Sequence, residues 1–353
     1  MSILYIITQA DGGGAQKYVL ALAKHFKGTI AAGDEAQKLF DDARAAGIEV
    51  YPLRHLKRSI HPWHDFLAMW EIRRLANSLK PDIVHLNSTK AGILGSFACV
   101  GLNTKVIFTA HGFRFLEPMS FYARMFYLAL EKVASSYRDF IITVSDADKK
   151  AALENELIAE NKIQTIHNGI GQIQFYDKDT AKAELGIPKH KKVIGVIANN
   201  YPTKGVDLLE KAIKSKPIEG TVVAVIGQGF ETKKSDDNIM YLGFRENASQ
   251  YLKAFDILVL PSRKEGLPFV LLEAMQAGLP ILAANVGGVA EALDNSGVLI
   301  PPEDSEGLAR EIESLIKNDN RMDLLSKKAQ ERSKLFREER MLKETEKIYK
   351  KIL

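Results

Sequence analysis

Short apolar runs alternate with longer amphipathic segments along the whole chain. In the first half these runs predict strands at residues 4–7, 82–85, 105–109, 140–144 and 163–166, and in the second half at 193–197, 221–226, 257–260, 280–284 and 297–300. The segments between them suit crossover helices, which indicates parallel sheets. Each half has its own set of strands. We therefore expect an α/β protein of two doubly wound domains, residues 1–168 and 169–340.

Size and composition support a two-domain globular protein. The 353 residues exceed the usual size of one domain, and the net charge of +4 is too small to indicate a nucleic-acid-binding protein. The single cysteine, Cys99, lies in an apolar stretch and is expected to be buried, so no disulfide framework is available. No signal-peptide pattern precedes the first strand and no apolar run approaches ~20 residues. These features predict a cytoplasmic protein with at most peripheral membrane contact.

Two glutamates frame the most informative segment, residues 261–280. Glu265 falls in the loop after the predicted strand 257–260, and Glu273 falls in the early turns of a helix predicted over 269–277, which Gly278 closes. Neither position is typical of a core residue. Ligands of open α/β sheets bind at the carboxyl ends of strands, and helix N-termini attract anions. Two acceptor side chains beside such a helix fit a ligand with hydroxyl groups and phosphates, as in a nucleotide-sugar.

This segment closely resembles the donor-site signature of the retaining glycosyltransferases of family 4, which have the GT-B fold. The family pattern of two glutamates eight apart is met by Glu265-Gly266 and Glu273-Ala274-Met275. The resemblance implies two Rossmann-like domains facing a central cleft, with the second domain binding the nucleotide-sugar. It also implies that the last helix, residues 341–353, returns to the first, acceptor-side domain.

Two further segments resemble phosphate-facing parts of the family. Asp11 is followed by a glycine run and a predicted helix, and the backbone amides of Gly13 and Gly14 can approach an anion closely. The loop after strand 193–197 keeps the family lysine as Lys204 but has Asn199 where relatives have an arginine. Asparagine can donate a hydrogen bond but cannot neutralise charge. One cation of the expected diphosphate clamp is therefore missing.

Other loops resemble the family less strongly. Proline has no N–H, so the helix after Pro268 would offer the amides of Phe269 and Val270 to the phosphates. The donor-binding residues expected from the resemblance are Gly13, Gly14, Asn199, Lys204, Gly227, Phe244, Arg245, Gly266, Leu267, Phe269, Val270 and Glu273.

One histidine stands out among eight. His111 follows the predicted strand 105–109 at its carboxyl end, and it resembles the family histidine that contacts the transferred sugar. The two histidines His61 and His64 lack the companions that a metal site needs. Asp146-Ala-Asp148 imitates a metal-binding motif, but Ser145 and Asp146 precede a helical pattern, so helix capping explains them better. The resemblance implies no catalytic metal and no cofactor.

The chemistry implied by the resemblance is transfer of a sugar from a nucleoside diphosphate, which we expect to be UDP, with front-face attack and retained configuration. Glu265, His111 and Lys204 would be the catalytic residues, with Lys204 stabilising the leaving diphosphate. Glu265 would hold sugar hydroxyls and Glu273 the ribose. Glycoside hydrolysis also uses two carboxylates, but the phosphate-binding elements argue against it.

The acceptor side is indicated by basic and aromatic stretches. Arg54, Lys57 and Arg58 form a basic stretch with apolar neighbours, and residues 116–127 are rich in aromatic side chains. Both suit an anionic membrane surface, although a core-facing role for the aromatic residues is equally compatible. The surrounding sequence resembles bacterial enzymes that extend polyprenyl-diphosphate-linked oligosaccharides for cell-surface polysaccharides. Two alternatives stay open: a non-catalytic nucleotide-sugar-binding protein and a GT-B sugar-nucleotide epimerase.

Overall fold

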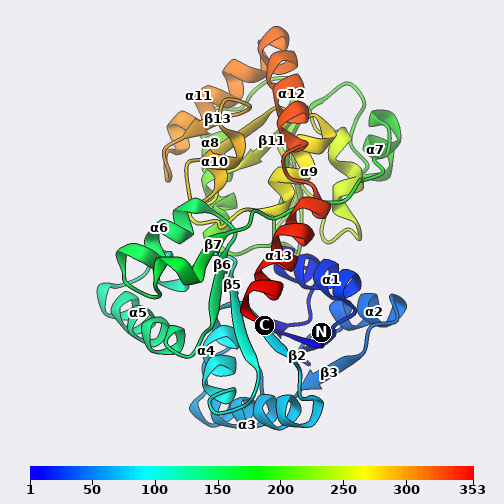
Figure 1. Ribbon diagram of the computed structural model, residues 1–353. Coiled ribbons are helices and arrows are strands. Elements are labelled where there is room, and N and C mark those ends of the chain that lie inside the picture. The colour runs from blue at the N-terminus through cyan, green and yellow to red at the C-terminus, as the bar shows by residue number, and fades with distance from the viewer. The chain divides into compact units, whose positions relative to one another are not determined.

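The computed structural model describes residues 1–353 and divides into two compact units (Figure 1). The first unit combines Met1–Asn168 with Glu338–Leu353, and the second is Gly169–Arg337. Each unit contains one sheet in which every pair of neighbouring strands is parallel. The expected α/β class with two parallel sheets is confirmed.

The first unit has a seven-stranded sheet in the order β3-β2-β1-β4-β5-β6-β7. Its strands are β1 Ile3–Gln9, β2 Thr29–Gly33, β3 Val50–Leu53, β4 Ile83–Asn87, β5 Lys105–Ala110, β6 Phe140–Thr143 and β7 Ile163–Thr165. Its helices are α1 Gly14–Phe26, α2 Lys38–Ala45, α3 Pro62–Leu79, α4 Thr89–Ala98, η1 Arg114–Leu116, α5 Phe121–Ser135, α6 Asp146–Glu154, η2 Glu160–Lys162 and α13 Glu338–Ile352. The strand order reverses between β1 and β4, which is where such sheets bind ligands.

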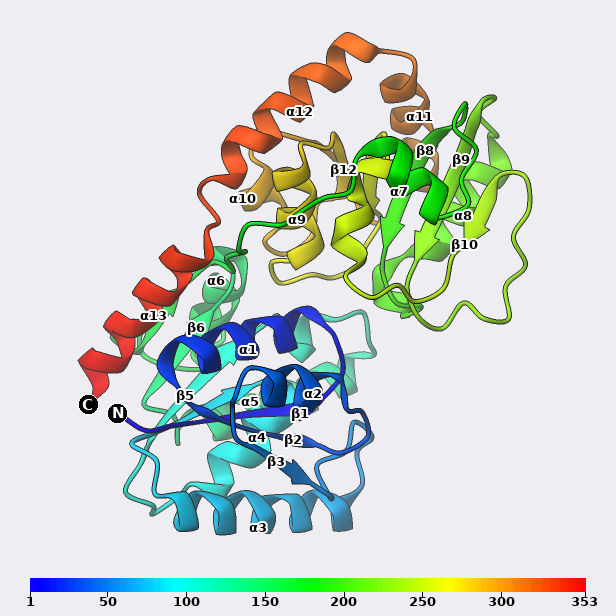
Figure 2. The same ribbon diagram turned by 90° about the vertical axis from the view of Figure 1, so that its right-hand side faces the viewer.

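Helices cover both faces of this sheet. On one side α3, α4 and α5 pack in a row, with α4 in the middle, and on the other α13 packs against α1 (Figures 1 and 2). Central strands are covered on both faces; β4, for example, is buried along its whole length. Cys99, at the end of α4, is buried as expected.

The last helix is fixed to this sheet by a buried polar contact. Tyr349 of α13 shares a 2.6 Å hydrogen bond with Nδ1 of His85 on β4, and its hydroxyl donates to the hydroxyl of Tyr5 on β1 at 3.3 Å. The other ring nitrogen of His85 lies 2.7 Å from Oγ1 of Thr109 on β5. One histidine therefore connects β4, β5 and the C-terminal helix.

The second unit has a six-stranded sheet in the order β10-β9-β8-β11-β12-β13. Its strands are β8 Lys192–Ile197, β9 Thr221–Ile226, β10 Ile239–Tyr241, β11 Ile257–Leu260, β12 Ile281–Ala284 and β13 Val298–Ile300. Its helices are α7 Lys178–Glu184, η3 Pro202–Lys204, α8 Val206–Ser215, η4 Ala248–Ala254, α9 Phe269–Ala277, α10 Val289–Leu293, α11 Ser305–Ile316 and α12 Asp319–Ser333. Here the order reverses between β8 and β11.

Three strands were not expected from the sequence. β2, β3 and β10 are the outer strands of their sheets on one side. Residues 29–33 are Thr-Ile-Ala-Ala-Gly and residues 50–53 include Pro52, so neither has the run of large apolar residues found in central strands. No helix of the structure combines the length and apolar character that crossing a bilayer requires.

Candidate active site

The centre of the candidate site is an ion pair between the loops that follow β8 and β11. Nζ of Lys204 lies 2.7 Å from Oε1 and 3.0 Å from Oε2 of Glu265. The hydroxyl of Ser262 donates to the same carboxylate at 2.7 Å. Because β8 and β11 flank the reversal of strand order, this pair lies where an open α/β sheet binds its ligands.

Two glycines allow these loops to approach one another. Gly205 has φ +64°, and a Cβ atom there would lie 1.9 Å from the carbonyl oxygen of Pro261. Gly287, in the loop after β12, has φ +51°, and its Cβ would lie 1.9 Å from the carbonyl oxygen of Glu265. Any side chain would separate the backbones that carry Lys204 and Glu265. The close packing therefore sets the position of the ion pair.

Arg263 joins three segments around the pair. Its guanidinium donates two parallel hydrogen bonds to Asp207 on α8, at 2.8 and 2.7 Å, and two to Glu303 after β13, at 2.5 and 3.2 Å. It also donates to the carbonyl of Pro202 at 2.6 Å, while its backbone N–H donates to Thr203. The Arg263 contact holds the pKa of Asp207 below its usual value. The planar guanidinium group of arginine, with its several N–H donors, is required to make all these hydrogen bonds at the same time.

Glu273 lies on α9, within the first two turns. The helix spans Phe269–Ala277 as predicted, and it has neither a side-chain cap nor an acidic residue in its first turn. Its N-terminus therefore keeps the positive end of the helix dipole for an anion. The expectation that the two glutamates avoid buried positions is wrong, since Glu265 is 8% and Glu273 is 6% exposed. Periodicity located the strand end but could not predict how closely neighbouring loops cover it.

Asn199 connects two loops at the ends of β8 and β9. Its Oδ1 accepts a hydrogen bond from the backbone N–H of Gln228 at 3.0 Å. The neighbouring Asn200 donates from Nδ2 to the carbonyl of Gly229 at 2.6 Å and from its backbone to Gln228. The loop beginning at Gly227 is therefore held by two asparagine side chains. An arginine at position 199 could not accept the bond from Gln228.

The remaining second-unit candidates lie on nearby strand-end loops. Phe244 and Arg245 follow β10; Phe244 is exposed and Arg245 is half-buried. The carbonyl of Gly243 accepts a hydrogen bond from Gly227, which brings the loops after β9 and β10 together. Gly266 accepts a hydrogen bond from the N–H of Gly288, and Leu267 is buried. The expected donor-binding residues of this unit thus lie on loops that follow the strands, except Phe269, Val270 and Glu273, which lie on α9.

The glycine loop of the first unit follows β1. Gly13 precedes the first residue of α1, Gly14, and this helix also lacks a side-chain cap and a first-turn acid. Asp11 lies just before the glycines, and its Oδ1 is buried without a hydrogen-bond partner. Burial raises the pKa of Asp11, against an opposing hydrogen bond from Gly13. Asp11 is therefore a polar group of this loop that the motif comparison overlooked.

His111 lies directly after β5, as predicted. Its Nε2 is 3.1 Å from Oδ1 of Asn87 at the end of β4, and its ring contacts the ring of Tyr18 edge-on. Asn87 in turn donates to the carbonyl of His85. Asn87 orients His111 and was missed by sequence reasoning, although its place at a strand end next to β5 was the available signal.

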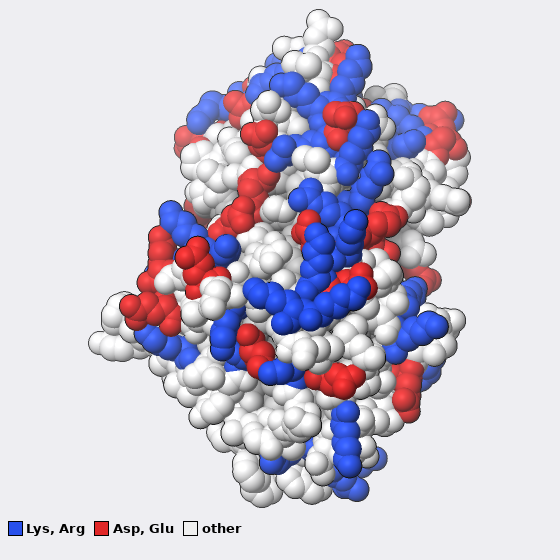
Figure 3. Space-filling view, in the orientation of Figure 1, with Lys and Arg blue, Asp and Glu red and all other residues white.

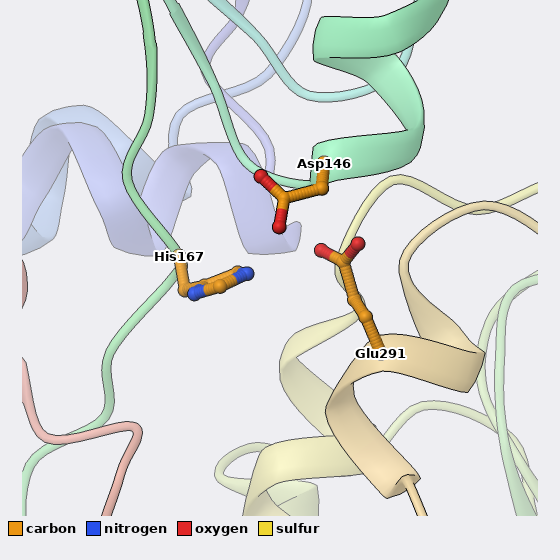
Figure 4. A group of neighbouring side chains, drawn as sticks. All are labelled: Asp146, His167 and Glu291. Carbon is orange, nitrogen blue, oxygen red and sulfur yellow. The ribbon is translucent and has the colours of Figure 1, made fainter.

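The acidic motif after β6 behaves as a helix cap. The hydroxyl of Ser145 accepts from the N–H of Asp148 at the start of α6, as expected. Figure 4 shows the carboxylate of Asp146 and the ring of His167, both in the first unit, and Glu291 on α10 of the second unit. Within either unit alone this group offers at most two metal ligands, too few for a structural site.

The basic stretch expected at the acceptor side lies between β3 and α3. Arg54 and Arg58 are exposed and Lys57 is half-buried. The histidines beside it bond to each other, since Nδ1 of His55 lies 2.8 Å from Nδ1 of His64, and His64 N–H points to Nδ1 of His61. The aromatic residues of α5 are mostly exposed, so a core-facing role is wrong for Phe121, Tyr122 and Phe126.

Comparison with known proteins identifies the class of this protein as a glycosyltransferase with the GT-B fold. The family model described as glycosyl transferases group 1 matches residues 177–332, and the model of glycosyltransferase family 4 matches residues 12–171. The chain belongs to this family of glycosyltransferases.

Several bacterial glycosyltransferases are similar in sequence. The UDP-Gal:alpha-D-GlcNAc-diphosphoundecaprenol alpha-1,3-galactosyltransferase of Escherichia coli is 28% identical over 66% of this chain and 65% of its own length, just under two thirds. The O-antigen biosynthesis glycosyltransferase WbnH of Escherichia coli is 28% identical over 84% of this chain and 85% of its own. The crystal structure of Anabaena Alr3699/HepE with UDP-glucose superimposes with a TM-score of 0.84 at 20% identity, covering 99% of this chain and 100% of that one.

Proposed function

We propose that the protein is a retaining, metal-independent glycosyltransferase that moves a sugar from UDP to a hydroxyl of a polyprenyl-diphosphate-linked glycan in cell-surface polysaccharide synthesis. The observation that carries this proposal is the Lys204–Glu265 pair at the reversal of strand order in the second unit. The lysine can neutralise the diphosphate of a nucleotide-sugar, and the carboxylate can accept hydrogen bonds from its sugar. These are the two groups between which the bond breaks.

Each residue has a defined role in the proposed reaction. As the bond from the anomeric carbon to the diphosphate breaks, negative charge grows on the phosphate oxygens, and Lys204 together with the Phe269 and Val270 amides would stabilise it. Glu265 would accept hydrogen bonds from the sugar, and Glu273 from the ribose. The acceptor hydroxyl then attacks from the side that the diphosphate leaves. Its proton passes to the departing phosphate.

Residues of the first unit complete the proposal. The amides of Gly13 and Gly14 would bind a phosphate oxygen, and His111 would contact the transferred sugar from an orientation fixed by Asn87. A lipid-linked acceptor and a UDP-linked donor are supported by the relatives, among them the galactosyltransferase whose name specifies a diphosphoundecaprenol acceptor. Action at the cytoplasmic face of a membrane follows from such an acceptor.

The test combines the purified protein with one UDP-sugar at a time and a short synthetic polyprenyl-diphosphate N-acetylglucosamine. We expect a disaccharide-lipid whose new linkage has the anomeric configuration of the donor by NMR, and the same rate with EDTA. Tight UDP binding without product would favour the non-catalytic alternative, and a changed nucleotide-sugar without transfer would favour an epimerase. Loss of transfer in EDTA that returns with a divalent cation would refute metal independence.

A further inference from the structure

The helices α3 and α5 of the first unit leave large aromatic side chains in solvent. On α3 the exposed rings are Trp63, Phe66 and Trp70, and the two tryptophans are 64% and 54% exposed. Their spacing of three and four residues puts them on one stripe, opposite the buried residues Ala68 and Ile72. These rings therefore point away from the sheet that α3 covers.

The same arrangement recurs on α5. Phe121, Tyr122, Met125 and Phe126 are exposed, with Tyr122 at 84%, while the buried side of the helix carries Glu131 and other residues facing the sheet. The helices α3, α4 and α5 pack as one row on the same face of the sheet, so both stripes belong to the helical layer on that face (Figure 1). Several large apolar side chains exposed on each helix of one layer mark an interaction site.

The charges of these helices are distributed unevenly between surface and interior. The exposed charged side chains are cations: Arg73, Arg74, Arg124 and Lys132. In contrast, the carboxylates are covered or paired: Asp65 binds Lys90 at 2.5 Å, Glu71 accepts from the N–H of His55, and Glu131 forms a buried pair with Arg138. The lowest part of Figure 3, where α3 lies, accordingly shows blue and white atoms and no red.

Aromatic side chains among cations fit one kind of partner. Tryptophan and tyrosine rings favour the headgroup level of a bilayer, and anionic lipids attract arginine and lysine. We propose that the outer faces of α3 and α5 form a docking surface for anionic phospholipid membranes, with Trp63 and Trp70 inserted among the headgroups. The inference rests on the proposed function, because a polyprenyl-linked acceptor resides in a bilayer. A second copy of the chain fits poorly, since a two-fold contact would oppose these cations to each other.

The tryptophans make this proposal testable in the unmodified protein. The chain has two tryptophans, and both lie on the exposed stripe of α3, so tryptophan fluorescence, excited selectively over that of tyrosine, reports from this surface alone. Adding vesicles of phosphatidylglycerol and phosphatidylcholine should shift the emission to the blue, and brominated lipids should quench it. Vesicles of phosphatidylcholine alone should act much more weakly. Vesicle binding without any change in emission would overturn the placement on α3, and absence of vesicle binding would overturn the proposal.

Variants then separate docking from catalysis. Replacing Trp63, Phe66 and Trp70 by serine should reduce vesicle binding roughly tenfold or more, because binding scales with buried apolar area. Replacing the exposed Leu324 and Leu335 of the second unit by serine is the matched control and should leave binding unchanged. With a detergent-dispersed acceptor, the α3 variant should keep the transfer rate of the unaltered protein. If the emission shifted to the blue with rising protein concentration in the absence of lipid, a second copy of the chain would cover this surface. That result would refute membrane docking.

Failure of this inference and failure of the proposed function give different results. If the protein transfers sugar to a dispersed acceptor but binds no vesicles, the docking surface is wrong and the activity stands. If vesicles bind through α3 and no UDP-sugar is used, the surface stands and the activity is wrong.

Discussion

Lys204 and Glu265 are 61 residues apart in sequence, yet their side chains form a bidentate contact. In this structure the lysine neutralises a carboxylate that is nearly buried. A bound diphosphate would compete with that carboxylate for the same ammonium group, and the sugar hydroxyls would supply new donors to Glu265. The pair therefore keeps both groups in position and compensated before the donor arrives, which lowers the cost of organising the site.

Replacing Lys204 should lower kcat/KM for the donor more than replacing a lysine elsewhere on the surface. A lost charge-assisted hydrogen bond is worth about 1.5–3 kcal/mol, so Lys204→Ala should lower kcat/KM for the donor by roughly one to two decades. Asn199 provides no second cation, and Glu265 would lose its partner. The exposed Lys214→Ala on α8 is the control, measured in the same assay. Equal kcat/KM for both variants would remove Lys204 from the site.

The candidate residues were predictable to the extent that local sequence determines their place. The strand-loop-helix order located Glu265, Glu273 and Lys204 at the ends of β8 and β11, since apolar runs and glycines mark these boundaries. The contacts of Asn199 and Asn87 were not predictable, because each depends on a partner from a neighbouring strand. Pairing between strands is a tertiary property that no local pattern contains.

At the scale of elements, Arg263 fixes the loop after β11 to α8 and to the loop after β13. Arg263→Lys keeps the charge but loses the planar fork, so we expect kcat/KM for the donor to fall about tenfold, with loss of thermal stability. A double-mutant cycle with Asp207→Asn should give a coupling energy of about 0.5–3 kcal/mol. Additive effects would show that the two side chains act independently. An unchanged kcat/KM in Arg263→Lys would show that this contact does not position the site.

The contact between β4 and α13 predicts how stability depends on pH. Burial lowers the pKa of His85 to about 3, so the folded state keeps this ring neutral while the unfolded chain binds a proton below its ordinary value near 6.5. Stability from His85 is thus complete above pH 6.5 and is lost as pH falls toward 3. His85→Gln should be less stable at pH 7 but should lose less on acidification.

This is measurable by urea unfolding between pH 8 and 4, followed by fluorescence, because both tryptophans belong to the first unit. His190→Gln, at an exposed position, should keep the pH dependence of the unaltered protein. If the free energy of unfolding changed equally with pH in the unaltered protein, His85→Gln and His190→Gln, a special role for His85 would be contradicted.

Most elements of the fold followed from the apolar pattern, and the exceptions have a common cause. Central strands such as β11 are buried on both faces and consist of isoleucine, leucine and valine, which sequence analysis detects. β3 and β10 lie at sheet edges and are short, and β2 contains alanines and glycine. Their strand conformation depends on pairing with a stronger neighbour rather than on their own composition.

At the scale of the molecule, one plan is used twice. Each unit has a parallel sheet whose strand order reverses once, and in each the candidate residues follow the strands beside that reversal or next to it. In the first unit these are the glycine loop after β1 and His111 after β5, and in the second they are Lys204 and Glu265. The α3–α5 face is a separate feature of the first unit. The proposed chemistry therefore lies at the loops that follow the strands, and the proposed membrane contact lies on the helices α3 and α5.

In the proposed reaction Glu265 acts on the reacting sugar, while Glu273 binds ribose, remote from the bond that breaks. The most direct measurement is the transfer rate of Glu265→Gln and Glu273→Ala against donor concentration at saturating acceptor. We predict that Glu265→Gln lowers kcat by on the order of 10²–10³, while Glu273→Ala mainly raises KM for the donor. Near-normal kcat in Glu265→Gln, together with loss of kcat at unchanged KM in Glu273→Ala, would contradict these roles of the two glutamates.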